Sequence, residues 1–418
     1  MTDASTEGGS NKKEKPLSKI DWVLLPVLSL VTIVAIVCSV ETLARFLYTE
    51  SNTTTIKCLV VNDPTTGVRA IPNTNCSQKI FESELTNYAI NSCGHRAGIE
   101  CGSKPYGTYR IVLVGSSFNY GMWVPREKSF AALLPVELSR RTGRRVELYN
   151  EAMQWGMPHS VDLRLNEVLA AKPDMILWPL TPTDIKSVDM TLPYVGPPGN
   201  DGKVIDTHGE AAGKILEGWR RVELAFTAKS PLEFIRDAWK RLVSTLDDTR
   251  SVFLLQHILF KSQSQYVRQY LMQSDASEYL QTEPTAAWVR NLAHFAGYFA
   301  DVQAQADSIG ATVVVVILPE RAQAAMISMN EWPTGFDPYK LGDEVRSIVM
   351  SYGGTYIDIL SGFRNIPNPE RNYLPVDGHP YASGQALISD LLAEALTSGA
   401  VPALKVATGP QRARSTSP

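Results

Sequence analysis

Two serines, Ser116 and Ser117, directly follow an aliphatic run and could supply a nucleophile. A serine hydroxyl is a poor nucleophile at neutral pH unless a base accepts its proton. Of the six histidines, His379 has Asp377 two positions before it, and an aspartate can orient an imidazole and stabilise its charged form. Serine, histidine and aspartate together are the residue types that perform acyl transfer.

An alternation of strands and helices is predicted to position these residues. Ile111 to Val114 is a continuous aliphatic run, typical of a strand covered on both faces, and Gly115 ends it. Further strands are expected at Val146 to Asn150, Asp174 to Leu180, Thr312 to Leu318 and Thr355 to Ile359. The expected helices are Ser129 to Arg141, Val161 to Lys172, Trp288 to Ser308, Leu341 to Tyr352 and Tyr381 to Leu396. This rhythm predicts an α/β fold, a three-layer α/β/α sandwich with a doubly wound parallel sheet.

In such a sheet, ligands bind beyond the carboxyl ends of the strands. The turn that carries Ser117 and the loop that carries His379 both follow strands, so we expect them at the same edge. His159 is a rival base, although its position favours a polar residue at a helix start. The other four histidines have no motif around them.

The serine turn, Gly115-Ser-Ser-Phe-Asn-Tyr-Gly121, resembles the first block of the SGNH/GDSL hydrolases, Gly-Asp-Ser-aromatic-Thr-x-Gly. The segment from Asn91 to Arg96 and the entry into the first strand are similar to the lead-in of membrane-linked members. The string that begins at Asp377 resembles the family's last block, Asp-x-x-His-Pro-x-x-x-Gly, with one residue fewer between Asp and His. The resemblance implies that Ser117 is the nucleophile, His379 the base and Asp377 its orienting residue.

The resemblance also implies an oxyanion hole. Its donors would be the main-chain N–H groups of Ser117 and Gly156, the latter matching the family's second-block glycine. Thr183 occupies the position of the family's third donor, an asparagine, and its hydroxyl can donate one hydrogen bond. Ser116 stands where the family has aspartate, and Asn119 where it has threonine.

The amino-terminal region predicts a membrane anchor. Residues 1–19 form a polar tail with four lysines. The segment from Trp22 to Val40 contains no charged residue, and its length fits a helix that spans a bilayer. The lysines precede the span, so the positive-inside rule places the tail in the cytoplasm and the remainder outside, in the periplasm if the source is bacterial. A cleaved signal peptide is the alternative, although no clear small-x-small cleavage site is present.

Four cysteines, Cys58, Cys76, Cys93 and Cys101, lie after the span and before the first core strand. Four cysteines in an oxidising compartment suggest two disulfides. Local pairing, Cys58 with Cys76 and Cys93 with Cys101, closes the shortest loops and is the expected one of three possibilities. A zinc site is disfavoured because no Cys-x-x-Cys pair occurs.

These features divide the chain into a tail (1–19), a transmembrane helix (20–42), a disulfide-containing lead-in (43–108), a hydrolase-like domain (109–398) and a second tail (399–418). A helical insert at 186–288 interrupts the domain; Ser230, Pro231 and Glu233 there give a strong helix-start pattern. Its apolar stripes are expected to pack on the main domain rather than to face lipid.

The expected function is that of a membrane-anchored esterase acting on an O-acyl ester outside the cytoplasm, such as one on envelope polysaccharide or lipid. An O-acyltransferase using the same residues, and a non-catalytic protein that binds carbohydrate or a partner, are the alternatives. Neither a cofactor nor a metal is expected. The net charge of −3 gives no bulk attraction to nucleic acid, and no nucleic-acid partner is expected.

Overall fold

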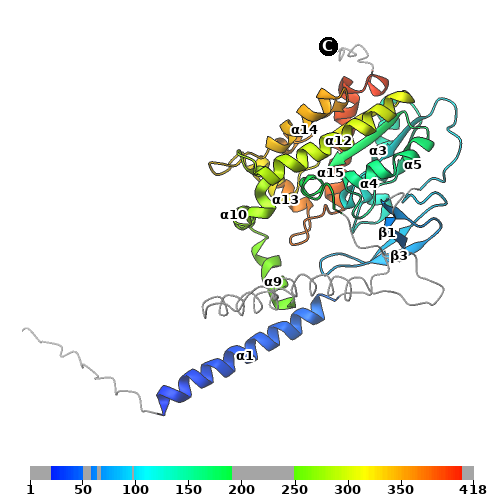
Figure 1. The fold of residues 1–418 in the computed structure, drawn as a ribbon. Coiled ribbons are helices and arrows are strands. Elements are labelled where there is room, and N and C mark those ends of the chain that lie inside the picture. Colours follow the sequence, from blue (N-terminus) through cyan, green and yellow to red (C-terminus); the bar gives the residue numbers. More distant parts are fainter. Residues whose placement is uncertain (1–19, 50–57, 64–66, 97, 191–248, 407–418) are drawn as a thin grey trace, which may run out of the picture.

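The computed structural model describes residues 20–49, 58–63, 67–96, 98–190 and 249–406 of the chain (Figure 1). The tail at 1–19, most of the tail at 399–418 and the helix expected to start at Ser230 lie outside the described residues. The insert is described from residue 249 onwards.

A five-stranded, fully parallel sheet forms the centre of the fold. Its strands are β5 (Tyr109–Leu113), β6 (Val146–Asn150), β7 (Met175–Leu180), β8 (Thr312–Ile317) and β9 (Thr355–Tyr356). They lie in the order β6-β5-β7-β8-β9, so the chain reverses its direction of travel across the sheet after β6. The carboxyl end of β5 lies at that reversal, where doubly wound sheets bind ligands. The predicted fold class is confirmed.

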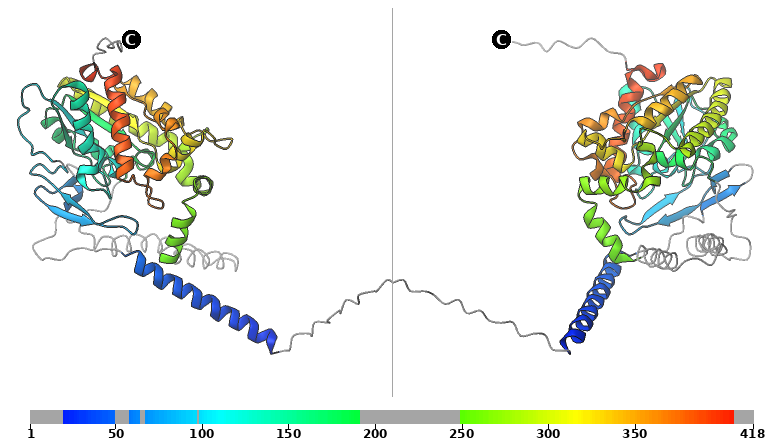
Figure 2. Two further views of the ribbon diagram at one scale, coloured as in Figure 1. Left: turned by 180° about the vertical axis from the view of Figure 1, so that it is seen from behind. Right: turned by 60° about the vertical axis from the view of Figure 1, so that its left-hand side comes forward.

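Helices cover both faces of the sheet. On one face α3 (Phe130–Thr142) packs against α15 (Ala382–Ala395). On the other, α12 (Ala286–Ser308) contacts α4 (Pro158–Leu163) and α14 (Lys340–Ser351). Figure 2 shows α15 from behind, opposite the side from which α12 is seen in Figure 1. Trp178 of β7 and Phe295 of α12, both fully buried with ring centroids 5.6 Å apart, join sheet and helix in the core.

Three elements differ from the sequence-based expectation. The helix expected at Val161 to Lys172 is two helices, α4 and α5 (Leu165–Ala170), because Arg164 leaves helical geometry and turns its buried guanidinium to Glu151. Strand β9 ends at Tyr356. An additional helix, α13 (Arg321–Met329), follows β8.

The lead-in forms two hairpins, β1 (Leu59–Asp63) with β2 (Gly67–Ala70) and β3 (Asn75–Gln78) with β4 (Thr86–Ala89). The two disulfides are the expected ones, Cys58–Cys76 and Cys93–Cys101. The hairpins lie between the sheet domain and the amino-terminal helix (Figure 2).

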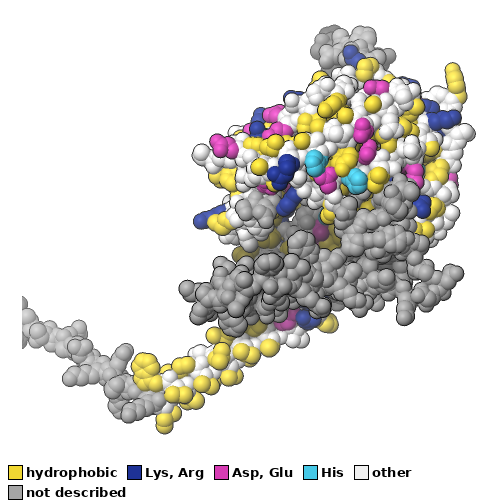
Figure 3. Space-filling view, in the orientation of Figure 1, with side chains coloured by type: hydrophobic (Ala, Val, Ile, Leu, Met, Phe, Trp, Pro, Cys, Tyr) yellow, Lys and Arg dark blue, Asp and Glu magenta, His cyan; other side chains and the backbone are white. Residues whose placement is uncertain are grey.

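The amino-terminal helix, α1 (Asp21–Leu47), has the length and hydropathy of a membrane span from Trp22 to Leu47, and a signal sequence would share these properties. Its apolar side chains are exposed along its length (Figure 3). Glu41 accepts hydrogen bonds from the N–H groups of Arg250 and Ser251, so the described part of the insert begins beside the end of α1. The described part of the insert contains α9 (Arg250–Leu259), α10 (Gln263–Leu271) and α11 (Ser274–Ser277). Elsewhere in the fold, the short helix α2 (Ser117–Tyr120) follows β5, and α6 (Pro182–Lys186) follows β7.

Candidate active site

Ser117 lies at the carboxyl end of β5, as the first residue of α2. Gly115 makes the sharp turn possible: its φ is +122°, and a Cβ there would approach the amide nitrogen of Asn119 to 2.1 Å. That amide donates to the carbonyls of Val114, at 3.0 Å, and Pro179, at 2.7 Å. Asn119 thus ties the serine turn to the end of β7.

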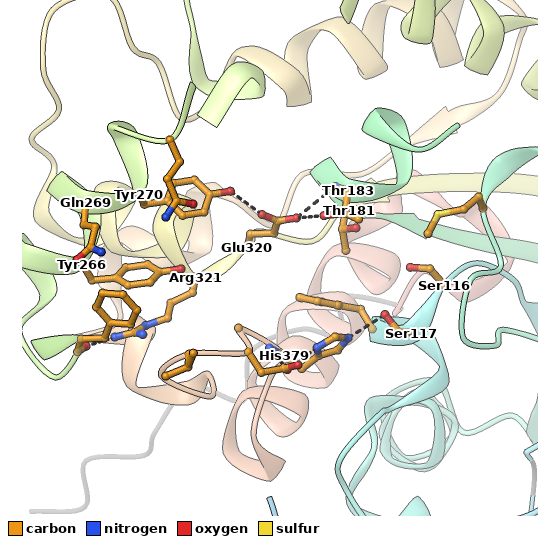
Figure 4. Close-up of a pocket in the computed structure, with 17 residues that line it drawn as sticks. Ser116, Ser117, Thr181, Thr183, Tyr266, Gln269, Tyr270, Glu320, Arg321 and His379 are labelled. Atoms are coloured by element: carbon orange, nitrogen blue, oxygen red, sulfur yellow. Dashed lines mark hydrogen bonds and ion pairs between the residues drawn. The ribbon is translucent and has the colours of Figure 1, made fainter. Parts of the chain in front are cut away.

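The structure brings Ser117, His379 and Asp377 together. Figure 4 shows the imidazole of His379 directed at Ser117. His379 Nε2 lies 2.8 Å from the Ser117 hydroxyl oxygen, and His379 Nδ1 lies 2.6 Å from Asp377 Oδ1. With the imidazole proton on Nδ1, facing the carboxylate, Nε2 is free to accept the proton of the serine hydroxyl. This is the geometry of a nucleophile, a base and an orienting residue.

The shortened Asp–His spacing is accommodated by Gly378, at φ +86°. The turn lets Asp377 Oδ1 also accept the main-chain N–H of His379, at 3.1 Å. Burial alone would raise the pKa of Asp377, but the neighbouring His379 imidazole and the hydrogen bonds from His379 outweigh it and lower the pKa. Asp377 is therefore held as the carboxylate.

Arg96, from the lead-in, holds the segment that follows Ser117. Its buried guanidinium donates to the carbonyls of Tyr120 (2.8 Å), Gly121 (2.6 Å) and Val124 (2.7 Å). The same group lies over the Tyr88 ring, 4.3 Å from its centroid. A planar group with several fixed donors suits this clamp, and a lysine could not reproduce it.

Glu82, also from the lead-in, holds the other half of the site. Its carboxylate accepts the main-chain N–H of Val376 at 3.1 Å and that of Asp377 at 2.6 Å. Burial raises the pKa of Glu82 to about 7, although these main-chain donors favour the ionised form. His257 Nδ1 of α9 lies 3.4 Å from the same carboxylate. The lead-in therefore contacts two segments beside the pair, the one that follows Ser117 and the one that precedes His379.

No sequence pattern indicated the roles of Arg96 and Glu82. The lead-in pattern that contains Arg96 signalled only a family resemblance, and Glu82 has no local motif. Both act through contacts with residues far away in the chain.

The expected oxyanion donors are placed differently from one another. Ser117 begins α2, and the first N–H groups of a helix have no intrahelical acceptor. The N–H of Gly156 donates to the Met153 carbonyl at 3.0 Å. Thr183 donates its hydroxyl proton to Glu320, at 2.6 Å. In this structure, then, two of the three donors expected from the sequence have other acceptors.

Ser116 and Thr181 surround a buried carboxyl, Asp184. The Thr181 N–H and hydroxyl both donate to Asp184, at 2.6 and 3.0 Å. Burial raises the pKa of Asp184 to about 6, and a hydrogen bond with the Ser116 side chain opposes the rise. Ser116 thus faces Asp184, while Ser117 faces the imidazole.

The remaining described histidines have other neighbours. The ring of His159 packs at a tilt against that of Tyr298, with ring centroids 5.4 Å apart. His95 pairs with the buried Glu151, and His294 with Asp189. His208 lies outside the described residues. Of the histidines in the described part of the chain, His379 is the one bonded to Ser117.

A pocket of 270 Å³ opens beside Ser117 and His379. One wall is the end of the sheet, with Thr181 and Thr183, and the facing wall is α10 of the insert. Glu320, which precedes α13, lies between these walls (Figure 4). No sequence pattern indicated that Glu320 lies at the pocket.

No family model matches the sequence, and no curated protein matches it. Solved structures do match. An acetylxylan esterase from Geobacillus stearothermophilus is 11% identical with a TM-score of 0.35, the match covering 69% of this chain and 94% of that one. A putative GDSL-like lipase from Parabacteroides merdae is 10% identical, with a TM-score of 0.35 and coverage of 71% and 96%. A lipase/acylhydrolase from Enterococcus faecalis is 13% identical, with a TM-score of 0.31 and coverage of 69% and 95%. By name, these three solved structures are those of an esterase, a lipase and a lipase/acylhydrolase.

Proposed function

We propose that this protein is a membrane-anchored serine esterase that hydrolyses an O-acyl ester outside the cytoplasm. The observation that carries the proposal is the Ser117–His379 hydrogen bond of 2.8 Å, with Asp377 on the other ring nitrogen. The resemblance of three sequence blocks to the SGNH/GDSL hydrolases supports it.

The chemistry follows from this arrangement. His379 Nε2 takes the Ser117 proton while the serine oxygen bonds to the ester carbonyl carbon. The tetrahedral intermediate collapses, the bond to the alcohol oxygen breaks, and His379 returns the proton to that leaving oxygen. Water then repeats the sequence on the acyl-serine, which releases the carboxylic acid and restores the hydroxyl.

Oxyanion stabilisation is assigned chiefly to the Ser117 N–H. The Gly156 N–H and the Thr183 hydroxyl would have to leave Met153 and Glu320 before they could donate to substrate, so we give them minor roles. The N–H of Ser117 needs no such exchange because it lies at the start of α2.

The location rests on the amino-terminal sequence. The lysine-rich tail followed by the apolar α1 supports a cytoplasmic tail and an external site. The two disulfides after α1 are compatible with an oxidising compartment.

A fluorophosphonate probe, which reacts with activated serines, tests the proposal on the full chain in detergent. We expect labelling of the wild type, no labelling of Ser117→Ala and strong loss in His379→Gln. His159→Gln is the matched control and should label like the wild type. A folded wild type that neither reacts nor hydrolyses aryl acetates would favour the carbohydrate- or partner-binding alternative.

A further inference from the structure

One face of α10 lines the pocket beside the catalytic pair. Tyr266, Gln269 and Tyr270 of this helix, with Gln273 just after it, follow the spacing i, i+3, i+4 and i+7 that places side chains on one helix face. Figure 4 shows Tyr266, Gln269 and Tyr270 across the pocket from Ser117 and His379. The face thus places two tyrosine and two glutamine side chains along the pocket.

The two amides are available to a ligand. Both Gln269 and Gln273 are exposed, and within the described ranges neither side chain hydrogen-bonds to another residue. An amide group both donates and accepts, as a hydroxyl group does. Two such amides on one wall suit a ligand that carries several hydroxyl groups.

Glu320 adds a charge beside that wall. Its carboxylate is fixed by Thr183, through N–H at 3.2 Å and hydroxyl at 2.6 Å, and by the Tyr270 hydroxyl at 2.9 Å. A carboxylate accepts from sugar hydroxyls and repels an anionic headgroup such as a phosphate. Arg321, the cation that also lines the pocket, donates its guanidinium protons to the carbonyls of Pro375 and Phe260 and lies over the ring of Tyr266.

The size of the pocket adds a constraint. At 270 Å³ it lies below the usual range for small-molecule sites, roughly 300–1,000 Å³. A single sugar ring with a short acyl group matches this space better than a fatty acyl chain with its headgroup.

We propose that the α10 face and Glu320 bind a sugar ring, so that the substrate is a short-chain acyl ester of a carbohydrate hydroxyl. The inference rests on the proposed function and specifies its substrate class. Gln269 and Gln273 bind ring hydroxyls, and Glu320 orients the ring by accepting from one of them.

The test compares two acetates of similar shape, 6-O-acetylglucose and cyclohexylmethyl acetate, which lacks the ring hydroxyls. The measured quantity is the ratio of their kcat/KM values, from acetate release by the full chain in detergent. We expect the wild type to prefer the sugar ester, and Gln269→Ala and Glu320→Gln each to lower the ratio about tenfold. Gln265→Ala, on α10 but outside the pocket, is the matched control and should keep the wild-type ratio. Equal rates on both acetates, or a preference for a long-chain acyl ester or an acetate of a cationic alcohol, would overturn the proposal.

A binding measurement separates this inference from the catalytic proposal. Saturation-transfer NMR of glucose with Ser117→Ala needs no turnover. Transfer to the sugar that Gln269→Ala in the same background removes supports the subsite even if the protein proves not to hydrolyse esters. Absence of transfer overturns the subsite even if Ser117 proves reactive.

Discussion

The buried carboxylate of Glu82 lies 2.6 Å from the main-chain nitrogen of Asp377, two positions before His379. A residue of the lead-in therefore fixes the loop on which the base and its orienting residue lie, although it touches neither imidazole nor serine.

Replacement of Glu82 by glutamine is expected to change how stability depends on pH. The pKa of Glu82 is raised from its ordinary 4.5 to about 7, so the folded chain holds this proton more tightly than the unfolded chain. A raised acid pKa makes the free energy of unfolding fall as pH rises between those values, by about 3 kcal/mol. In Glu82→Gln the free energy of unfolding should not show this part of the decline. Thermal midpoints measured from about pH 5 to about pH 8 check the difference from the wild type. Glu84→Gln, exposed and nearby, is the control; a curve for Glu82→Gln parallel to the wild type would contradict the prediction.

Arg96→Lys should lower both stability and turnover. The lysine keeps the charge but cannot reach three carbonyls, so we expect a loss of about 2–4 kcal/mol in the free energy of unfolding. Displacement of the serine turn should lower kcat on an aryl acetate about 10²-fold with a smaller change in KM. Arg144→Lys, where an exposed guanidinium donates to the Ala403 carbonyl, provides the control. Unchanged kcat in a variant of reduced stability would limit Arg96 to a structural role.

Thr183→Val is expected to cost less than about tenfold in turnover. Removal of a donor aimed at the oxyanion typically costs about 10²–10³-fold, but the Thr183 hydroxyl already donates to Glu320. Thr183→Asn supplies an amide with two donors and should turn over faster than Thr183→Val. Initial rates on an aryl acetate check both variants. A loss of about 10²-fold in Thr183→Val would instead show that the hydroxyl moves from Glu320 to the substrate.

Removal of either disulfide should lower the free energy of unfolding, and the longer loop should give the larger loss. The pairs close loops with separations of 18 residues, for Cys58–Cys76, and 8 residues, for Cys93–Cys101. Chain entropy gives about 3 and about 2.5 kcal/mol respectively for their removal. Unfolding of the paired cysteine-to-serine variants measures this, and non-reduced peptide mapping checks the pairing. Four free thiols in the mature protein would refute it.

Membrane topology gives the last prediction. We expect alkaline phosphatase fused after residue 418 to be active, because that enzyme is active only in an oxidising compartment outside the cytoplasm. A fusion of green fluorescent protein at the same position is the complementary control, because it should fluoresce only if that end remains in the cytoplasm. Fluorescence without phosphatase activity would reverse the proposed orientation.

The central sheet could be predicted because its strands are local signals. The run from Thr312 to Ile317 is almost entirely valine and isoleucine, and the expected boundaries were correct within a residue for β6, β7 and β8. The proximity of Ser117 and His379 followed from topology, since both come after parallel strands. Helix α13 was not predicted because it lacks the alternation of apolar and polar residues that marks a helix with one buried face. Nearly all its side chains are buried, including Gln323.

The supports of the site could not be predicted for a different reason. Arg96, Glu82 and Glu320 contact residues that are distant in the chain, and no spacing rule connects them. The break at Arg164 likewise depends on where the fold places Glu151. Such contacts are consequences of the tertiary structure, so periodicity does not report them.

The contacts that Arg96 and Glu82 of the lead-in make with the site bear on how this protein could be shortened or recombined. A chain that began at Tyr109 would retain the whole parallel sheet together with Ser117, His379 and Asp377. It would lack the guanidinium beneath the serine turn and the carboxylate beneath the histidine loop. Domain boundaries drawn around the sheet alone would therefore remove Arg96 and Glu82, the side chains that hold the segments beside Ser117 and His379 in place. A transfer of the proposed site to another protein would therefore need the stretch from Cys58 onwards as well as the sheet.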